Sequence, residues 1–254
     1  MKTEILYEDN SILVIRKPAG LAVQSAGIGQ PDVVSELKSY LAKLPSAGRP
    51  GKGEPYLGIV HRLDQPVEGL LVFAKDKKAA ATLSKQLTEG ALNKHYYAVL
   101  CGYPDCPEGD LVDYLRKEGN VAVAVTGREQ EFADAKIAAL HYRILEEIND
   151  PSPLALADVT IETGRFHQIR VQFAHAGFPL LGDTKYGMAA LKEAMPAQKY
   201  RGVALCAYSL ELVHPISGKK MGFRVVPKNP AFAGFAMEEL KKLTENETGI
   251  SKRG

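Results

Sequence analysis

The chain has 254 residues, of which 45% are hydrophobic and 24% charged, so it is long enough for a sizeable core and has an ordinary globular composition. Its formal net charge of +2 is too small to indicate a nucleic-acid or membrane partner, although a local basic surface remains compatible with it. No apolar run reaches the roughly 18–20 residues that a membrane span needs, and no signal peptide is recognisable at the N-terminus. A membrane-spanning chain is therefore not expected.

The three cysteines, Cys101, Cys106 and Cys206, form an odd set without a Cys-x-x-Cys pair. That arrangement suits neither a disulfide framework nor a zinc site. A reducing cytoplasm is the expected location, because unpaired thiols persist there.

Short strands and two helices are predicted for the first ninety residues. Apolar runs at 5–7 and 12–15 flank a turn-forming stretch and indicate two strands. Asp32 is placed to cap one helix, and residues 77–87 are predicted to form a second. The inward faces of the two helices are expected to carry Val33, Val34, Leu37, Leu41, Leu44, Ala80, Leu83 and Leu87. Residues 45–55, rich in Pro, Gly, Ser and Lys, are expected to form a loop.

Residues 58–75 carry charged and turn-forming side chains between two apolar runs. The pattern predicts two short buried strands joined by a loop that holds Arg62 and Asp64. Buried segments rarely place an arginine beside a carboxylate unless each has a partner or the site is functional. From these residues alone, an internal ion pair or a solvated loop explains the pattern at least as well as a functional site.

The rest of the chain is predicted to be mostly extended, with two further helices. Strands or extended segments are expected at 94–102, 121–125, 135–148 and 154–161, and a hairpin at 203–213 and 221–226. Helices are expected at 166–176 and 233–243. Few strict strand–helix alternations occur, which favours an α+β fold with a mainly antiparallel sheet.

Residues 163–170 combine a glycine-containing turn with cationic and amide side chains at the start of a predicted helix. The N–H groups and positive dipole at a helix N-terminus suit a phosphate. A capped helix with surface arginines explains the pattern equally well.

Two other groups of residues favour structural explanations. Residues 182–187 are better explained by a tight surface turn, and His175 and His214 by structural roles. His61, His167 and His175 do not show metal-ligand spacing, so no metal site is expected.

Taken together, these motifs resemble the RluA-type pseudouridine synthases. The residues that carry the resemblance are Lys17-Pro18-Ala19-Gly20, His61-Arg62-Leu63-Asp64, Gly69-Leu70-Leu71, Ala74-Lys75, Lys94, Tyr96, Ala98, Gly102, Thr163-Gly164-Arg165, His167-Gln168-Ile169-Arg170, Gly177, Pro179, Gly182-Asp183 and Tyr186-Gly187. They extend over roughly residues 5–226 in the family's order and spacing. Agreement at so many positions is far more specific than any one short motif.

The resemblance implies isomerisation of a specific uridine in structured ribosomal or transfer RNA, without a metal or organic cofactor and without an obligate protein partner. The implied fold is a long, bent, mainly antiparallel mixed sheet with flanking helices. We expect one catalytic domain over residues 1–254, in which two half-sheet subdomains would meet after Gly102. A separate N-terminal RNA-binding domain is not expected, because the family motifs begin within the first twenty residues.

The same resemblance implies a role for each site residue. Asp64 is the catalytic aspartate, Tyr96 lies against the target base, and Arg170 pairs with Asp64. Arg62 helps to displace the target base or fills its place. The other residues implied to contact the RNA are His61, Arg165, His167 and Gln168.

Physical chemistry is consistent with this division of roles. Extruding a stacked base costs a few kcal/mol, and stacking on an aromatic side chain recovers about 1–3 kcal/mol. An arginine suits the position beside a buried carboxylate because it stays charged.

The sequence departs from the family at two places. Val67-Glu68 stands where many members have Thr-Ser, and Gln172 stands where histidine is frequent. Glu68 adds a negative charge near Asp64, and two effects of that charge are open: it disfavours the ionised form of Asp64, or it repels a phosphate. We expect both departures to affect substrate choice rather than the reaction.

Two alternatives remain open. An RNA-binding protein without catalysis would not need Asp64, Tyr96 and Arg170, which are all present. A nucleoside or glycoside hydrolase would need two carboxylates, for which Asp64 with Glu68 or Asp183 is a candidate pair. That function would leave the arginine-rich stretch at residues 163–170 unexplained.

Overall fold

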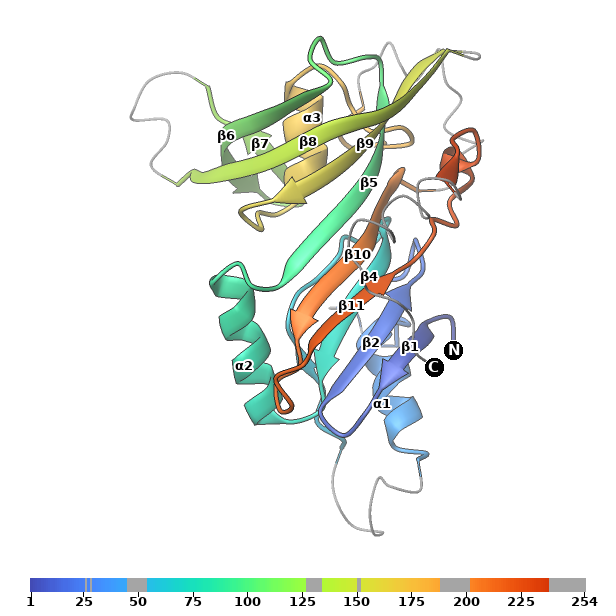
Figure 1. Ribbon diagram of the computed structural model, residues 1–254, viewed down its shortest axis with the longest axis vertical. Helices are drawn as coiled ribbons and strands as arrows, with labels where there is room; N and C mark the ends of the chain where they lie inside the picture. The colour runs from blue at the N-terminus through green and yellow to red at the C-terminus, as the bar shows by residue number, and fades with distance from the viewer. Residues whose placement is uncertain are drawn as a thin grey trace. The chain divides into compact units, whose positions relative to one another are not determined.

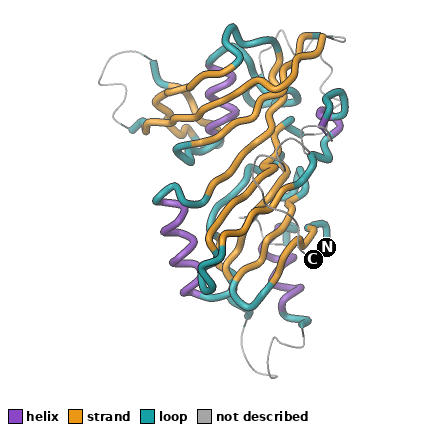
Figure 2. Tube along the Cα trace, viewed as in Figure 1, coloured by secondary structure: helices purple, strands orange, loops and turns teal. Residues whose placement is uncertain are grey.

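The computed structural model describes residues 1–25, 27, 29–44, 54–126, 134–149, 152–187 and 202–237. The chain divides into two compact units, shown in Figures 1 and 2. Unit 1 comprises residues 1–94 and 207–225, and unit 2 comprises residues 95–206 and 226–254. The expectation of a single catalytic domain stays a prediction, and each unit is described by itself.

Unit 1 is built on a strand order of β1-β2-β4-β10, with β3 paired to β4 and β11 to β10. The strands are β1 (Glu4–Glu8), β2 (Ile12–Lys17), β3 (Gly58–Ile59), β4 (Glu68–Ala74), β10 (Leu205–Val213, of which residues 207–213 belong to this unit) and β11 (Lys220–Arg224). Every residue of β2 and β4 is buried, including the charged Arg16 and Lys17 at the end of β2 and Glu68 at the start of β4.

Two helices accompany these strands. They are α1 (Val33–Leu41) and α2 (Lys77–Thr88). Asp32 caps α1 by accepting a hydrogen bond from the Ser35 N–H at 2.7 Å, as its position in the sequence predicted. Helix α2 buries Ala79 and Leu83 against Val14 of β2 and Val72 of β4, in one apolar cluster.

Unit 2 has the strand order β5-β9-β8-β6-β7, and the pairings β5–β9, β9–β8, β8–β6 and β6–β7 are all antiparallel. The elements are β5 (Asn93–Cys101), β6 (Glu108–Glu118), β7 (Val121–Ala124), β8 (Lys136–Asn149), β9 (Pro153–Ile161) and α3 (Gln168–His175). Helix α3 packs on β6 and β7, where Val171 joins Leu115 and Ala122 in a small core (Figure 1).

The predicted fold class is confirmed, since the described residues form eleven mainly antiparallel strands and three α-helices. Strand β6 was not predicted, because Gly109, Asp110 and Asp113 are poor strand formers. Of the predicted helix at 233–243, residues 238–243 lie outside the described residues, and a short 3₁₀ turn, η3 (Pro230–Phe232), precedes it. Most of the predicted 45–55 loop also lies outside them. No described helix is long and apolar enough to cross a membrane.

Candidate active site

The loop between β3 and β4 carries the first group of predicted site residues. The two strands pair antiparallel, with Gly58 opposite Ala74, as the apolar–charged–apolar pattern predicted. Within the loop His61 is buried, Arg62 is exposed and Asp64 is partly exposed. The carboxylate of Asp64 is therefore at the surface of unit 1, in a loop held at both ends by a sheet.

Lys17 fixes this loop from the end of β2. Its buried ammonium donates hydrogen bonds to the backbone carbonyls of Pro18 (3.0 Å), Leu21 (2.7 Å) and Gln65 (3.0 Å). Three acceptors match the three N–H donors of a charged lysine. Burial lowers the pKa of Lys17 to about 7, while the negative charges of Asp64 and Glu68 act in the opposite direction. The protonated form of Lys17 thus interacts electrostatically with Asp64, a role that the sequence did not reveal for this lysine.

Glu68, at the first position of β4, is buried and ion-paired. Its Oε2 lies 3.5 Å from Nη2 of Arg16, and both side chains are at most one-tenth exposed. The expectation that Glu68 leaves a negative charge facing a phosphate is therefore wrong, because a buried guanidinium balances it. Removing either partner would take away one of the opposite charges that stabilise the other in this buried position.

His61 is a buried, neutral ring. Its Nε2 accepts a hydrogen bond from the backbone N–H of Val72 at 3.3 Å, which places the ring proton on Nδ1. Burial, together with the nearby charge of Lys94, lowers the pKa of His61 to about 3. Nδ1 has no hydrogen-bond partner among the described residues. The predicted contact of His61 with RNA stays a prediction.

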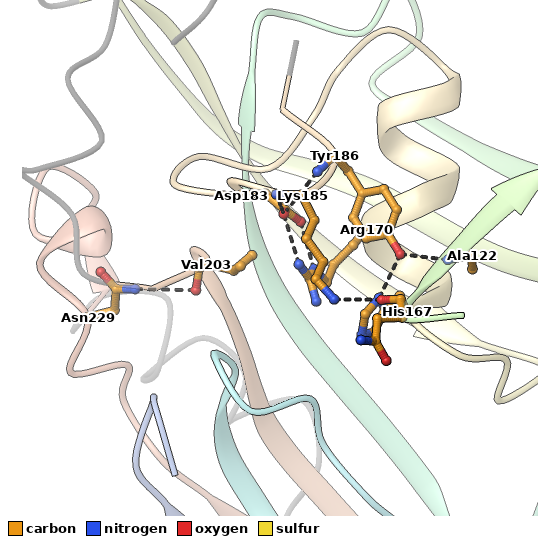
Figure 3. Close-up of polar contacts among 9 residues, drawn as sticks. Ala122, His167, Arg170, Asp183, Lys185, Tyr186, Val203 and Asn229 are labelled. Carbon is orange, nitrogen blue, oxygen red and sulfur yellow. Dashed lines mark hydrogen bonds and ion pairs between the residues drawn. The ribbon is translucent and has the colours of Figure 1, made fainter. Parts of the chain in front are cut away.

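In unit 2, Arg170 and Asp183 form a buried, two-pronged ion pair (Figure 3). Arg170 Nε donates to Asp183 Oδ2 at 2.7 Å, and Nη2 donates to Oδ1 at 2.8 Å. The backbone N–H groups of Lys185 and Tyr186 also donate to Oδ1, at 3.0 and 3.2 Å. The interpretation of residues 182–187 as a surface turn is therefore wrong for Asp183, which is only 4% exposed.

His167 and Tyr186 form a second polar contact beside this pair. The Nδ1 atom of His167 lies 2.6 Å from Tyr186 Oη, which also accepts the backbone N–H of Ala122 at 2.8 Å (Figure 3). The guanidinium carbon of Arg170 lies 5.1 Å from the centre of the Tyr186 ring, a distance typical of a cation–π contact. The chain at the start of α3 is thus joined to β7 and to the loop of Asp183.

Gln168 and Arg165 shape the turn before α3. The Oε1 atom of Gln168 accepts from Thr163 Oγ1 (2.8 Å) and from the Arg165 N–H (2.9 Å), and its Nε2 donates to Ala139 O (3.0 Å). Arg165 Nε donates to Ile137 O at 2.8 Å. The side chain of Gln168 is therefore occupied by the turn itself, whereas Arg165 is partly exposed.

The remaining predicted residues in unit 2 lie in its core. Tyr96 is 5% exposed on β5, opposite Val159 of β9. Gln172 is fully buried, and the two N–H groups of its Nε2 are shared among three acceptors, Leu111 O, Asp113 Oδ2 and Ala138 O, at 2.9–3.1 Å. Gln172 thus holds α3 to β6 and β8, so the expectation that it affects substrate choice is not supported by its position.

No described group of three or more His, Cys, Asp or Glu side chains is arranged to hold a metal ion. Both proposed second carboxylates of a hydrolase, Glu68 and Asp183, are buried in ion pairs with arginines. That engagement argues against a two-carboxylate hydrolase, whose carboxylates must reach the scissile bond.

Comparison with known proteins agrees with these motifs. Residues 11–175 match the family described as RNA pseudouridylate synthase. Ribosomal large subunit pseudouridine synthase D of Zymomonas mobilis is 34% identical over 228 residues, which cover 87% of this chain and 68% of the relative. The protein of the same name from Pseudomonas aeruginosa is 36% identical over 230 residues, covering 87% and 67%. The chain thus spans about two thirds of the length of these relatives.

Two solved structures share the fold. Human RNA Pseudouridylate Synthase Domain Containing 1 matches with a TM-score of 0.71 at 19% identity, covering 95% of this chain and 94% of that one. Human RNA Pseudouridylate Synthase Domain Containing 4 matches with a TM-score of 0.69 at 23% identity, covering 94% and 93%. The fold is therefore that of the pseudouridine synthases. With its sequence relatives, the chain belongs to the RluA-type family of RNA pseudouridine synthases, which are isomerases.

Proposed function

We propose that this chain converts a specific uridine of ribosomal or transfer RNA to pseudouridine, with Asp64 as the catalytic aspartate. In this reaction the bond between ribose and N1 of uracil breaks, and the base rejoins ribose through carbon 5. Carbon 5 loses its hydrogen as a proton and N1 gains a proton, so the product is an isomer of uridine. The observation that carries the proposal is the position of Asp64: a partly exposed carboxylate on a loop that Lys17 fixes, within the family motif.

The other roles are proposed on the motif match. Tyr96 would lie against the target base, and Arg170 would provide the positive charge that accompanies Asp64. Arg62 is exposed on the same loop as Asp64, which suits contact with the RNA at the target base. Arg165 and His167 are proposed to contact the RNA as well.

Ribosomal RNA is the favoured substrate class within this proposal. Relatives at 34–36% identity are named ribosomal large subunit pseudouridine synthase D. The cytoplasmic location expected from the cysteines is consistent with either RNA, and it stays a prediction.

The test is Asp64→Asn, which keeps the shape of the side chain and removes its charge. Pseudouridines are mapped in ribosomal and transfer RNA from cells that lack the gene and are complemented with wild-type or variant protein. We expect one site or a small set of sites to be restored by the wild type and by Asp105→Asn, an exposed carboxylate control, but not by Asp64→Asn. Restoration by a folded Asp64→Asn protein would refute the role of Asp64.

A further inference from the structure

Phe166 is an aromatic ring that the proposed reaction does not use. It stands between Arg165 and His167, and it is not among the residues that carry the family resemblance. Its side chain is 36% exposed. A single exposed apolar side chain is common on protein surfaces, so exposure alone indicates no function. The surroundings of this ring are more informative.

The Phe166 ring is held in a fixed position by its neighbour. Its centroid lies 3.8 Å from that of His167, and the two planes differ by only 21°. The His167 ring is in turn edge-on to Tyr186, at 5.6 Å and 81°, and is hydrogen-bonded to it. Three rings thus form a continuous group that runs from the buried side of the turn to its surface.

The backbone of His167, in the middle of this group of rings, has an unusual conformation. His167 has φ +55°, the only positive φ of a non-glycine residue in the described part of the chain. Neighbouring side chains do not face each other in a regular helix or strand, so two stacked consecutive rings require an irregular backbone. Strained backbone of this kind is found most often at functional sites.

Positive charge surrounds the exposed ring. Lys117 Nζ, at the end of β6, lies 4.9 Å from the Phe166 centroid. Lys117 itself is exposed, and Arg165 is partly exposed immediately before Phe166. A flat aromatic surface with cations beside it is the combination that single-stranded nucleic acid binds, because the base stacks on the ring while the cations meet the phosphates.

We propose that Phe166 is a stacking platform for an unpaired nucleobase of the RNA substrate, at a nucleotide other than the target uridine, with Lys117 and Arg165 contacting its phosphates. This inference rests on the proposed function for the identity of the substrate as RNA. Stacking tolerates any base, since every base has a π face. The platform would therefore favour substrates whose target lies in an unpaired segment, rather than a particular sequence.

The chain contains no tryptophan, which allows a direct test. Phe166→Trp in the Asp64→Asn background introduces a single fluorescent ring at the platform, in a protein that does not turn over. The probe is a short single-stranded oligouridylate. We expect its binding to quench the tryptophan emission, and inorganic polyphosphate, which carries charge without bases, to leave the emission unchanged.

Tyr114→Trp in the same background is the matched control. Tyr114 is 45% exposed on the same strand as Lys117, three residues away, so its side chain is on the opposite face of β6. We expect the oligouridylate to quench the emission of the Phe166→Trp protein and not that of the Tyr114→Trp protein. Equal quenching of both variants, quenching by polyphosphate, or no response to the oligouridylate would each overturn the platform.

A second pair of variants distinguishes the contribution of the aromatic ring from that of an apolar side chain of similar size. Phe166→Leu should weaken oligouridylate binding by roughly 5- to 150-fold, the range expected for the loss of one stacked base, whereas Phe166→Tyr should bind like the wild type. Wild-type affinity in a folded Phe166→Leu protein would contradict the proposal. These binding measurements do not depend on turnover. The stacking proposal can therefore be refuted while the role of Asp64 is confirmed, and the role of Asp64 can be refuted while the stacking proposal is confirmed.

Discussion

The guanidinium of Arg170 is clamped by both carboxylate oxygens of Asp183, at 2.7 and 2.8 Å, in the interior of unit 2. A planar arginine matches a carboxylate in this two-pronged geometry, which fixes its orientation as well as its charge. Asp183 is itself held by two backbone N–H groups. The orientation of Arg170 is thus set by Asp183, whose side chain is fully buried.

Asp183→Asn should impair both folding and activity through Arg170. The change removes the negative charge that both prongs of the buried Arg170 guanidinium contact, and we expect the free energy of unfolding to fall by about 3–5 kcal/mol. Urea titration followed by circular dichroism measures the loss. Asp110→Asn, which breaks the exposed contact of Asp110 with His141, is the control and should cost less than about 1 kcal/mol.

The positioning role needs a separate readout. If Asp183 orients Arg170 for catalysis, kcat should fall in the folded fraction of Asp183→Asn, while KM for the RNA changes little. An unaltered kcat in that fraction would assign Asp183 a purely structural role.

Gly69→Ala should destabilise unit 1 far more than a second glycine substitution. Gly69 has φ +128°, and a Cβ there would lie 2.5 Å from the backbone nitrogen of Ala207 and still closer to its carbonyl oxygen. We expect a loss of about 3 kcal/mol or more, since overpacking costs about 1–3 kcal/mol and the unfavourable φ about 1–2 kcal/mol.

Gly90→Ala is the matched control for that experiment. Gly90 also has a positive φ (+71°), but a Cβ added there would meet no atom within 4 Å, so only the backbone term of about 1–2 kcal/mol should remain. Chemical denaturation of the two variants gives the difference. Similar losses would show that the backbone contact with Ala207 relaxes without cost.

His61 should contribute to loss of stability in acid. Its pKa is about 3 in the folded protein and 6.5 when unperturbed, so between these values the unfolded chain binds more protons. Stability therefore falls as the pH is lowered from 6.5 towards 3, by at most about 1.4 kcal/mol per pH unit for this group.

His61→Gln is the comparison for this pH effect. A glutamine oxygen can accept the Val72 N–H, and it does not titrate. The stability of the variant, measured by urea titration at several pH values, should fall less steeply than that of the wild type over this window. Parallel curves would mean that His61 gains a proton without unfolding.

Local patterns in the sequence were enough to predict most elements and the position of the Asp64 loop. Apolar runs located β2 and β4, and Asp32 correctly predicted the start of α1. Strand β6 was missed because Gly109, Asp110 and Asp113, which are poor strand formers, interrupt its apolar residues. Helix α3 begins at Gln168 rather than at 166, since His167 adopts a left-handed backbone that sequence patterns assign to glycine or asparagine.

The partners of the charged residues could not be predicted from local sequence. Lys17 reaches the carbonyl of Gln65, 48 positions away, and Arg170 reaches Asp183 across a turn that resembled a surface loop. The spacing of charged residues along the chain identifies them as candidates for a functional site. Their ion-pair and hydrogen-bond partners depend on how distant segments pack together.

The division of the chain also has a consequence for its synthesis. Strands β1 to β4 of unit 1 are synthesised first. Strand β10, which lies beside β4 in the sheet, contributes residues 207–213 to this unit, and these are made only after the whole of 95–206. Until then a newly made N-terminal half presents an apolar strand with unpaired backbone groups, which is prone to aggregation. Shielding of that edge by the ribosome surface or a chaperone would be needed during translation, and fragments that stop before residue 207 should be recovered mainly as insoluble material.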